Sequence, residues 1–208
     1  MSRIFDISPP ITPELAVWPG DSPFQREVLL DIARGDSVTL STLHATVHLG
    51  AHADGLCHVA EGRLGIDAIP LDLFLGPCQV IRIDVPAGTR IELAHLGVPI
   101  TETRILLCTN TYPDPNRFET DFAALAPALV DYLHDRGVRL IGIDTPSVDL
   151  FESPDLPAHQ RCVAHDMAIL EGLVLGHVPT GRYELVALPL RLVGFDASPV
   201  RAILRSLA

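Results

Sequence analysis

The sequence predicts an α/β protein with a mixed β-sheet, folded as a single domain over residues 1–208. Three observations lead to this prediction. The chain is 48% hydrophobic with a mean hydropathy of +0.30, which provides enough apolar material to bury a full core. Short strand-like stretches alternate with helical patterns. The 18 prolines and 15 glycines are spread along the chain rather than gathered in a linker, so no domain boundary is indicated.

Six short stretches rich in β-branched and aliphatic side chains are each bounded by Gly, Pro or Asp, which is typical of strands. They cover residues 28–32, 37–47, 79–85, 104–109, 138–143 and 183–193. Two other stretches have the apolar spacing of helices: residues 123–135, which are followed by Gly137 as a C-terminal cap, and residues 159–170. This periodicity predicts the elements but not the order of the strands in the sheet.

Charge and composition exclude several classes of function. The 26 acidic residues against 15 basic residues give a net charge of −11, which disfavours nucleic acid as a partner. Every basic residue is an arginine, so Schiff-base chemistry and a phosphate-loop lysine are excluded. A membrane span would need about 18 consecutive apolar residues, and no such run occurs. The N-terminus lacks the apolar run of a signal peptide, so a cytoplasmic location is expected, with the four isolated cysteines reduced.

Four of the nine histidines lie within residues 43–58, LHATVHLGAHADGLCH. The even-numbered positions at the centre of this segment are polar, apart from one glycine, whereas the odd-numbered ones are apolar. In an extended chain successive side chains point to opposite faces, so His48, His52 and Asp54 would share one face. Imidazole nitrogens and a carboxylate are ligands that zinc and similar divalent ions prefer. The pattern therefore predicts a metal site on a strand that runs into a loop.

A helix would also bring His48 and His52 together, at positions i and i+4. Gly50 and Gly55 disfavour a helix, however, and no HExxH glutamate follows His48. His44 has the same parity but comes earlier in the strand, and we interpret it as structural. The same interpretation applies to three isolated histidines, His95, His134 and His177.

A second group of ligand-type residues follows downstream. The stretch PAHQRCVAHDMAILEGLVL contains His159 and Glu171, which could complete a metal site that the first group leaves unfinished. His58 comes four residues after Asp54 and beyond Gly55, so it need not share the ligand face. An unperturbed imidazole has a pKa of about 6.5, close to neutral pH, so we interpret His58 as an acid–base residue. A fifth metal ligand, or a residue that supports the ligands, is the alternative.

The pattern His48-x-Gly50-x-His52-x-Asp54-x3-His58 resembles the HxGTHxDxPxH motif of the cyclase-like metal hydrolases. Within that group the chain is most similar to the bacterial kynurenine formamidases. Further segments carry this resemblance from one end of the chain to the other: residues 6–10, 17–21, 70–72, 75–78, 142–147, 167–172 and 196–201.

The resemblance implies a swivelling β/β/α-type fold, a homodimer, and two divalent metal ions per subunit. Zinc is the first candidate, with manganese or cobalt as alternatives. By this resemblance His48, His52 and Asp54 bind one ion, and Asp54 bridges to the second. His159 and Glu171 match the residues that complete the coordination of the second ion.

The activity implied by the resemblance is hydrolysis of a small molecule, N-formyl-L-kynurenine, to L-kynurenine and formate. His58 matches the proton donor and acceptor, and Trp18 matches a residue that contacts the substrate. Packing at a turn is the alternative role for Trp18. Two departures from the motif, Leu56 in place of its proline and Val59 in place of an aromatic residue, are expected to reshape the pocket wall beside His58. The loop at residues 110–113 is also expected to diverge.

Other functions are left open by these patterns. A sibling hydrolase of another aryl amide, or of a cyclic imide of the isatin type, would use the same ligands. A non-catalytic metal-binding protein would keep the fold without the reaction. A serine hydrolase is disfavoured because no GxSxG elbow is present. Cys57 and His58 are adjacent, so on an extended chain they would point apart, which disfavours a cysteine nucleophile.

Overall fold

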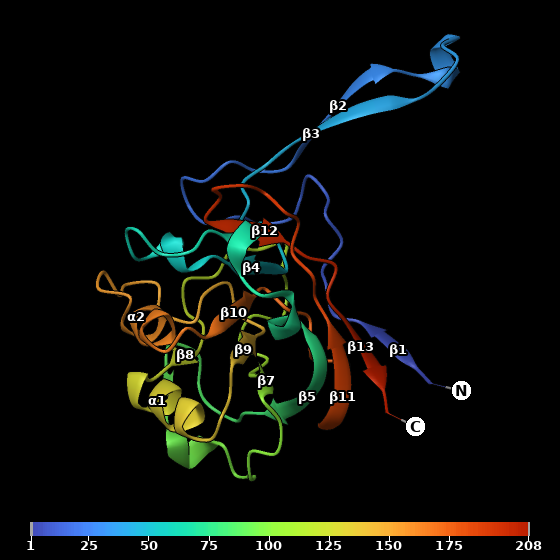
Figure 1. Cartoon of the computed structure of the whole chain (residues 1–208). Helices are drawn as coiled ribbons and strands as arrows, with labels where there is room; N and C mark the ends of the chain where they lie inside the picture. Colours follow the sequence, from blue (N-terminus) through green and yellow to red (C-terminus); the bar gives the residue numbers. More distant parts are fainter. Residues whose placement is uncertain (1, 208) are drawn as a thin grey trace.

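The computed structural model describes residues 2–207, and its centre is a nine-stranded mixed sheet (Figure 1). The four central strands, β5, β7, β9 and β10, run parallel, and the pairs on either side of them are antiparallel. This arrangement confirms the predicted α/β class with a mixed sheet. The strand order is β1 (Ile4–Asp6), β13 (Ile203–Ser206), β11 (Gly181–Val186), β5 (Leu75–Arg82), β7 (Arg104–Cys108), β9 (Leu140–Ile143), β10 (Ala168–Glu171), β4 (His52–Asp54), β12 (Ala197–Pro199).

Alternate side chains of the central strands enter two separate cores, one on each face of the sheet. On one face, α1 (Pro127–Asp135) and α2 (Pro157–Ala164) pack with Ile105, Ile141 and Ile169. On the other face, apolar residues of the irregular segment 55–74, which follows β4, pack with Val80 and Leu106. This segment contains three short 3-10 turns, η2 (Leu56–His58), η3 (Ile66–Ala68) and η4 (Leu71–Leu73). Because both faces are covered, the central strands are almost entirely apolar.

The first predicted helix is confirmed in its main part. α1 begins at Pro127, where the missing N–H of proline is harmless, and Gly137 follows its end with a left-handed φ of 79°. Residues just before the helix form β8 (Ala124–Leu125) instead, which pairs in parallel with β6 (Arg90–Ile91). A further 3-10 turn, η5 (Leu93–His95), follows β6.

Within residues 2–207, no helix has both the length and the apolar character needed to cross a membrane.

The second predicted helix, residues 159–170, is wrong over its second half. α2 ends at Ala164, and Asp166 then takes a left-handed conformation with φ 52°. Residues 168–171 form β10, which pairs with β9. The apolar run Ala168–Leu170 is compatible with a helix and equally with a buried strand, and its pairing with β9 makes it a strand.

The six predicted strands all coincide with strands of the structure, but their limits differ. The strand expected at residues 37–47 ends at His44, and the one expected at 183–193 ends at Val186. Four other strands of three or four residues, β1, β10, β12 and β13, lie outside the predicted strands, whereas β4 falls within the polar alternation that predicts a strand running into a loop. All four cysteines are free, as expected.

A two-stranded hairpin stands apart from the main sheet. It consists of β2 (Gln25–Leu30) and β3 (Leu40–His44), with the 3-10 turn η1 (Ile32–Arg34) near its tip. Figure 1 shows it extending away from the body of the protein. The connection from β3 to β4 leads from this hairpin directly into the main sheet.

The close approach of Gly172 to Gly50 predicts a specific loss of stability. Gly172 and Gly97 have left-handed φ values of 64° and 62°, so alanine at either position carries a similar backbone strain of roughly 1–2 kcal/mol. A Cβ atom on Gly172 would also collide with the backbone carbonyl of Gly50, whereas Gly97 has no atom within 4 Å of that position. Gly172→Ala should therefore lower the free energy of unfolding by about 1–3 kcal/mol more than Gly97→Ala. Urea unfolding of both variants measures the difference, and equal losses would contradict the tight approach.

Candidate metal centre

The strand β4 lies between β10 and β12 and carries two of the predicted ligands. His52 is directly opposite Glu171 in the antiparallel pair of β4 with β10. His52 and Asp54 are alternate residues of a strand and point to the same side, while Ala53 between them is buried in the core. The pairing therefore joins ligand-type residues from two segments that are far apart in the sequence.

His48 reaches the same point through a bend. Residues 45–51 are not part of a strand, and Gly50 within them has a left-handed φ of 57°. The bend brings Nδ1 of His48 to 3.3 Å from Oδ1 of Asp54. His48, His52 and Asp54 therefore converge as the polar alternation predicts, although the extended backbone expected up to residue 47 is wrong.

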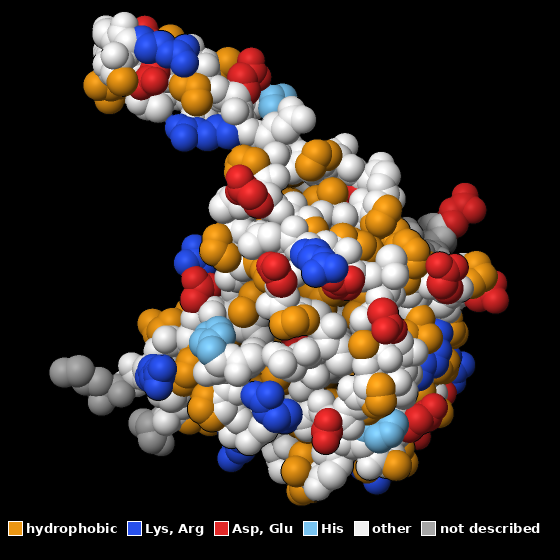
Figure 2. All heavy atoms as spheres, turned by 180° about the vertical axis from the view of Figure 1, so that it is seen from behind, with side chains coloured by type: hydrophobic (Ala, Val, Ile, Leu, Met, Phe, Trp, Pro, Cys, Tyr) orange, Lys and Arg blue, Asp and Glu red, His pale blue; other side chains and the backbone are white. Residues whose placement is uncertain are grey.

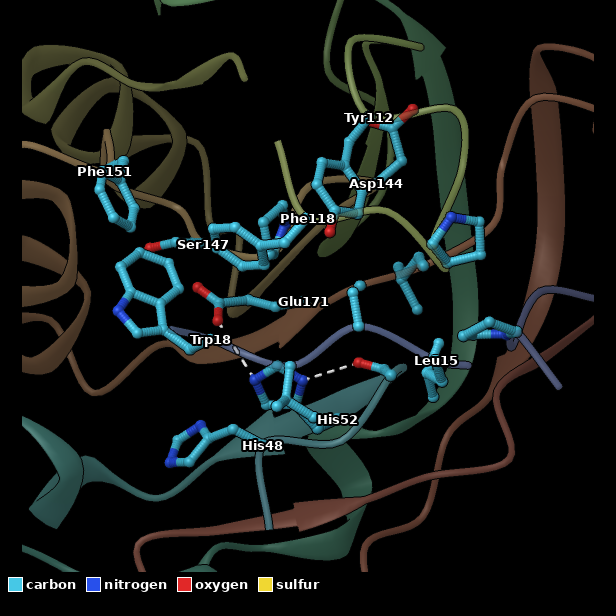
Figure 3. Close-up of a pocket in the computed structure, with 18 of the residues that line it drawn as sticks. Leu15, Trp18, His48, His52, Tyr112, Phe118, Asp144, Ser147, Phe151 and Glu171 are labelled. Atoms are coloured by element: carbon cyan, nitrogen blue, oxygen red, sulfur yellow. Dashed lines mark hydrogen bonds and ion pairs between the residues drawn. The ribbon is translucent and has the colours of Figure 1, made fainter. Parts of the chain in front are cut away.

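His159 and Glu171 join this group from α2 and β10. Nε2 of His159 lies 3.3 Å from Oε1 of Glu171 and 3.6 Å from Oδ2 of Asp54. Nε2 of His52 lies 3.2 Å from Oε2 of Glu171 (Figure 3). The five residues predicted as metal ligands thus form one buried cluster around Asp54, and their role as ligands stays a prediction.

Three polar atoms at the centre of the cluster are buried without a hydrogen-bond partner. They are Nε2 of His52 and both carboxylate oxygens of Asp54. Leaving such atoms unpaired in the interior is unfavourable. Nitrogen and oxygen atoms that are free in this way match the ligand set of a divalent metal ion. The groups His48–His52–Asp54 and Asp54–His58–His159 each bring three ligand atoms within 4.8 Å of one another. The residues present therefore fit a metal site.

The charges of the cluster favour added positive charge. Burial raises the pKa of Asp54, but the imidazoles of His159 and His48, at 3.6 and 3.3 Å from its oxygens, outweigh it and hold this pKa well below its usual range. Burial lowers the pKa of His48, yet the interaction with Asp54 raises it to about 9. The pKa of His159 is raised as well, because three neighbouring carboxylates outweigh its burial. The carboxylates of the site therefore stabilise positive charge on the neighbouring histidines.

Hydrogen bonds from outside the cluster orient the histidines. His52 donates from Nδ1 to the carbonyl oxygen of Gly50 at 2.8 Å, which leaves its Nε2 facing the cluster. His159 donates from Nδ1 to Asp149 at 2.9 Å. Such bonds fix both the tautomer and the orientation of the ring. Asp149 also accepts hydrogen bonds from the backbone N–H groups of Ala158 and His159 at the start of α2. Asp149 was not predicted as a site residue, because the only signal for it in the sequence is its position upstream of a helix.

Asp196 is a second residue that the local patterns did not predict, although it begins one of the segments that carry the resemblance. Its Oδ2 accepts a hydrogen bond from Nε2 of His48 at 3.0 Å and lies 3.6 Å from Nδ1 of His58. The His58 ring is 4.3 Å from the ring of His48, centroid to centroid, and its side chain is 31% exposed. His58 can therefore exchange protons with water at the edge of the cluster. Its grouping with Asp54 and His159 keeps the role of a fifth ligand open.

The cluster opens into a cavity of about 740 Å³ with aromatic walls (Figure 3). Trp18 lines this cavity together with Phe118 and Phe151, whose ring centroids are 5.4 and 5.1 Å from the indole. Tyr112 contributes another ring to the wall. Trp18 is half-buried, so it packs against neighbouring rings and also presents surface to the cavity. Its contact with a substrate remains a prediction.

The expectation that Leu56 and Val59 reshape the pocket wall is wrong. Leu56 is buried in the core, and Val59 packs against the same core, so neither residue lines the cavity. The 3-10 turn η2 directs Leu56 inward, while His58 at the end of the same turn lines the cavity. The wall instead includes Asn110 and Pro113, from the loop expected to diverge.

Of the described residues 2–207, acidic groups line the cavity, but no basic side chain other than histidine does. Among the residues that the structure describes, no arginine lines it. Asp144 lies on the wall and accepts hydrogen bonds from the backbone N–H groups of Thr109 and Asn110, so it also holds the loop after β7. His177, interpreted from the sequence as structural, lines the cavity too. His44 lies outside it, paired with Glu27 on the hairpin.

Comparison with known proteins identifies relatives over the whole chain. The Cyclase family model matches residues 5–150. A potential metal-dependent hydrolase with cyclase activity is 29% identical, with 100% of each chain covered and a TM-score of 0.86. A predicted metal-dependent hydrolase from Bacillus stearothermophilus is 29% identical, with 99% of this chain and 98% of that chain covered and a TM-score of 0.82. Isatin hydrolase A from Labrenzia aggregata shares the fold, at 22% identity, coverage of 100% and 94%, and a TM-score of 0.80.

The central place of His52 in the cluster predicts its effect on metal affinity. His52→Ala should weaken zinc binding by more than about 100-fold, because losing a direct ligand exceeds the 10–100-fold effect of losing an outer hydrogen-bond partner. His44→Ala, in the same histidine-rich segment but on the hairpin, is the matched control and should leave the affinity unchanged. Competition with a chelating dye measures both, and equal affinities in the two variants would contradict the assignment.

Proposed function

Because this chain belongs to the Cyclase family, we propose that it is a metal-dependent hydrolase whose first candidate substrate is N-formyl-L-kynurenine, which it cleaves to L-kynurenine and formate. One observation carries the proposal: a buried cluster with free ligand atoms around Asp54 opens into an aromatic cavity beside His58. The two relatives at 29% identity are described as metal-dependent hydrolases, which supports the reaction class. The motif resemblance supports the choice of substrate.

The motif resemblance supports two divalent ions in the cluster. His48, His52 and Asp54 would hold one ion, and Asp54 would be shared with a second ion held by His159 and Glu171. When bound, such ions polarise a carbonyl group and lower the pKa of water. Zinc is the first candidate, and manganese and cobalt accept the same nitrogen and oxygen ligands.

His58 is the acid–base residue in this proposal. Hydrolysis adds water to the formyl carbon and breaks the carbon–nitrogen bond, so the departing amine nitrogen must gain a proton. His58 accepts a proton from the water and donates it to that nitrogen, which avoids expulsion of an anionic amide. Asp196, 3.6 Å from its Nδ1, orients the ring.

The aromatic wall binds the ring of the substrate. Trp18, Phe118 and Phe151 already contact one another through tilted and edge-to-face geometries. An aryl ring that joins such a group gains about 0.5–1.5 kcal/mol beyond the burial of its area. A volume of about 740 Å³ lies within the range of cavities that enclose small organic ligands.

A neutral cyclic amide of the isatin type is the second candidate substrate, and the charge of the cavity favours it. N-formyl-L-kynurenine carries an α-ammonium group, which the acidic side chains of the cavity can pair with, and an α-carboxylate. For the carboxylate no partner is present, because no arginine of residues 2–207 lines the cavity and the sequence has no lysine. A neutral ring needs no cationic partner. Its hydrolysis would open the ring at the same metal cluster, and no formate would be released.

An activity assay with both substrates tests the proposal. The zinc-loaded protein should convert N-formyl-L-kynurenine to L-kynurenine, and chelation should abolish turnover. Parallel assays use formanilide, which lacks the carboxylate, and isatin. Faster turnover of isatin and formanilide would select the neutral class of substrate. Tight zinc binding without turnover of any of the three would contradict a hydrolase and favour a metal-binding protein.

Loss of the acid–base residue should lower turnover without loss of metal. His58→Ala should reduce kcat by about 10²–10⁴-fold, which is the usual contribution of general acid–base catalysis. His134→Ala, on α1 and outside the cavity, is the control and should retain full activity. Zinc content is measured in parallel, and loss of zinc from His58→Ala would identify this residue as a ligand instead.

A further inference from the structure

The segment of residues 147–151 connects the metal cluster to the aromatic wall of the cavity. The backbone N–H of Val148 donates to Oε1 of Glu171 in the cluster at 2.7 Å. Three residues later, Phe151 forms part of the aromatic wall. Ser147 begins this segment and lines the cavity as well. Its side chain is therefore close both to the cluster and to the rings that would contact a substrate.

Ser147 is held in place by the chain around it, and the residue is only 6% exposed. Its backbone carbonyl oxygen accepts a hydrogen bond from Oγ1 of Thr145 at 2.9 Å. Its Oγ accepts one from the backbone N–H of Asp149 at 3.1 Å. Figure 3 shows the side chain pointing toward the side of the cavity where Trp18 and Phe151 lie. The position of this hydroxyl group is thus fixed before a ligand binds.

The hydroxyl proton of Ser147 is not used by the protein. A hydroxyl group donates one hydrogen bond and accepts others. Oγ is satisfied as an acceptor by Asp149, but no atom of residues 2–207 accepts its proton. A buried donor that lacks a partner is unfavourable. A ligand atom in the cavity that accepts this proton therefore gains a hydrogen bond for which the protein itself does not compete.

Ser147 is also the only buried side chain outside the cluster, in the described part of the lining, that can donate. Five buried polar side chains line the cavity, and three of them belong to the cluster: His52, His159 and Glu171. The fourth is Asp144, whose two oxygens accept backbone N–H groups. A carboxylate accepts hydrogen bonds but does not donate them. The fifth, Ser147, favours a ligand that places an acceptor atom beside it.

We propose that Ser147 donates a hydrogen bond to a carbonyl oxygen on the aryl ring of the substrate, ortho to the nitrogen of the cleaved bond. The inference rests on the proposed function and narrows its substrates to ortho-acyl anilides. Because the N–H of Val148 contacts the cluster, the acceptor must lie near the cleaved bond, and the ortho position is the nearest on the ring. Both N-formyl-L-kynurenine and isatin carry a ketone there, whereas formanilide does not.

Two compounds that differ by this acyl group test the role of Ser147. They are formanilide and N-(2-acetylphenyl)formamide. The acetyl oxygen has two lone pairs, so it can accept from Ser147 as well as from the adjacent anilide N–H. Ser147→Ala should raise the Kd of the acetyl compound about 3–10-fold, the usual loss for one neutral hydrogen bond, and leave the Kd of formanilide unchanged.

Trp18 provides the signal for binding. It is the single tryptophan of the chain and lines the cavity, so quenching of its fluorescence reports ligands in the cavity of the metal-free protein. Figure 2 shows hydrophobic side chains on the projecting hairpin β2–β3, among them Leu29 and Leu43. The hairpin contains no tryptophan, so a compound that adsorbs there does not contact the reporter.

Ser198→Ala is the matched control. Ser198 is buried, and its Oγ also accepts a backbone N–H, that of Leu190, at 2.8 Å. Its proton is already donated to the carbonyl oxygen of Pro199, and it does not line the cavity. Ser198→Ala should therefore leave both Kd values unchanged. In zinc-loaded protein, kcat/KM for the two compounds should change in the same selective way, and thermal melting verifies that each variant is folded.

Three results would overturn the proposal. An equal rise of both Kd values in Ser147→Ala would mean that Ser147 acts only by supporting the backbone at Asp149. An unchanged Kd for the acetyl compound would mean that its oxygen is not bound by Ser147. Absence of quenching by the acetyl compound would mean that the cavity does not take this class of ligand. Failure of the proposed function is a separate result, namely no turnover of either compound by the zinc-loaded protein.

Discussion

Two buried carboxylates, those of Asp54 and Glu171, set the physical constraint on which the site depends. Burial raises the pKa of both groups and the charge on Asp54 raises that of Glu171 further, yet the histidines around them lower both pKa values. Neither oxygen of Asp54 is satisfied by a hydrogen bond within the protein. Such an arrangement is stable only with compensating positive charge. The insertion of β4 beside β10, the bend at Gly50 and the packing of α2 all serve to bring imidazoles around these carboxylates.

The cluster and the cavity wall are built from different kinds of structure. The cluster comes mainly from strands and a helix that are fixed by pairing and by two buried cores. The wall comes mainly from connections, such as those around Trp18, Tyr112 and Phe151. Loops vary more readily than the elements they connect, and function follows from the site rather than from the fold. This division explains why the family indicates metal-dependent hydrolysis more firmly than it indicates a particular substrate.

Polar alternation predicted that His52 and Asp54 point the same way, since they are alternate residues of β4. His48 joins them for another reason, the bend at Gly50, which the alternation does not indicate. Residues 168–171 fit a helix and a buried strand equally well, and only their pairing with β9 makes them a strand. The prediction that Leu56 lines the pocket was wrong because a one-turn 3-10 helix sets the direction of its side chain. Asp196 could not be linked to His48 by local pattern, because 148 residues separate them.

Asp149 gives the protein a property that neither the fold nor the cluster has alone. Its carboxylate accepts the first N–H groups of α2 and also the imidazole N–H of His159. One side chain therefore links the start of a helix to the orientation of a candidate ligand. Fraying of α2 would release His159, and occupancy of the cluster would in turn reinforce the helix. The abundance of free metal in the surroundings would then govern how long the chain survives proteolysis, in addition to how much of it is active.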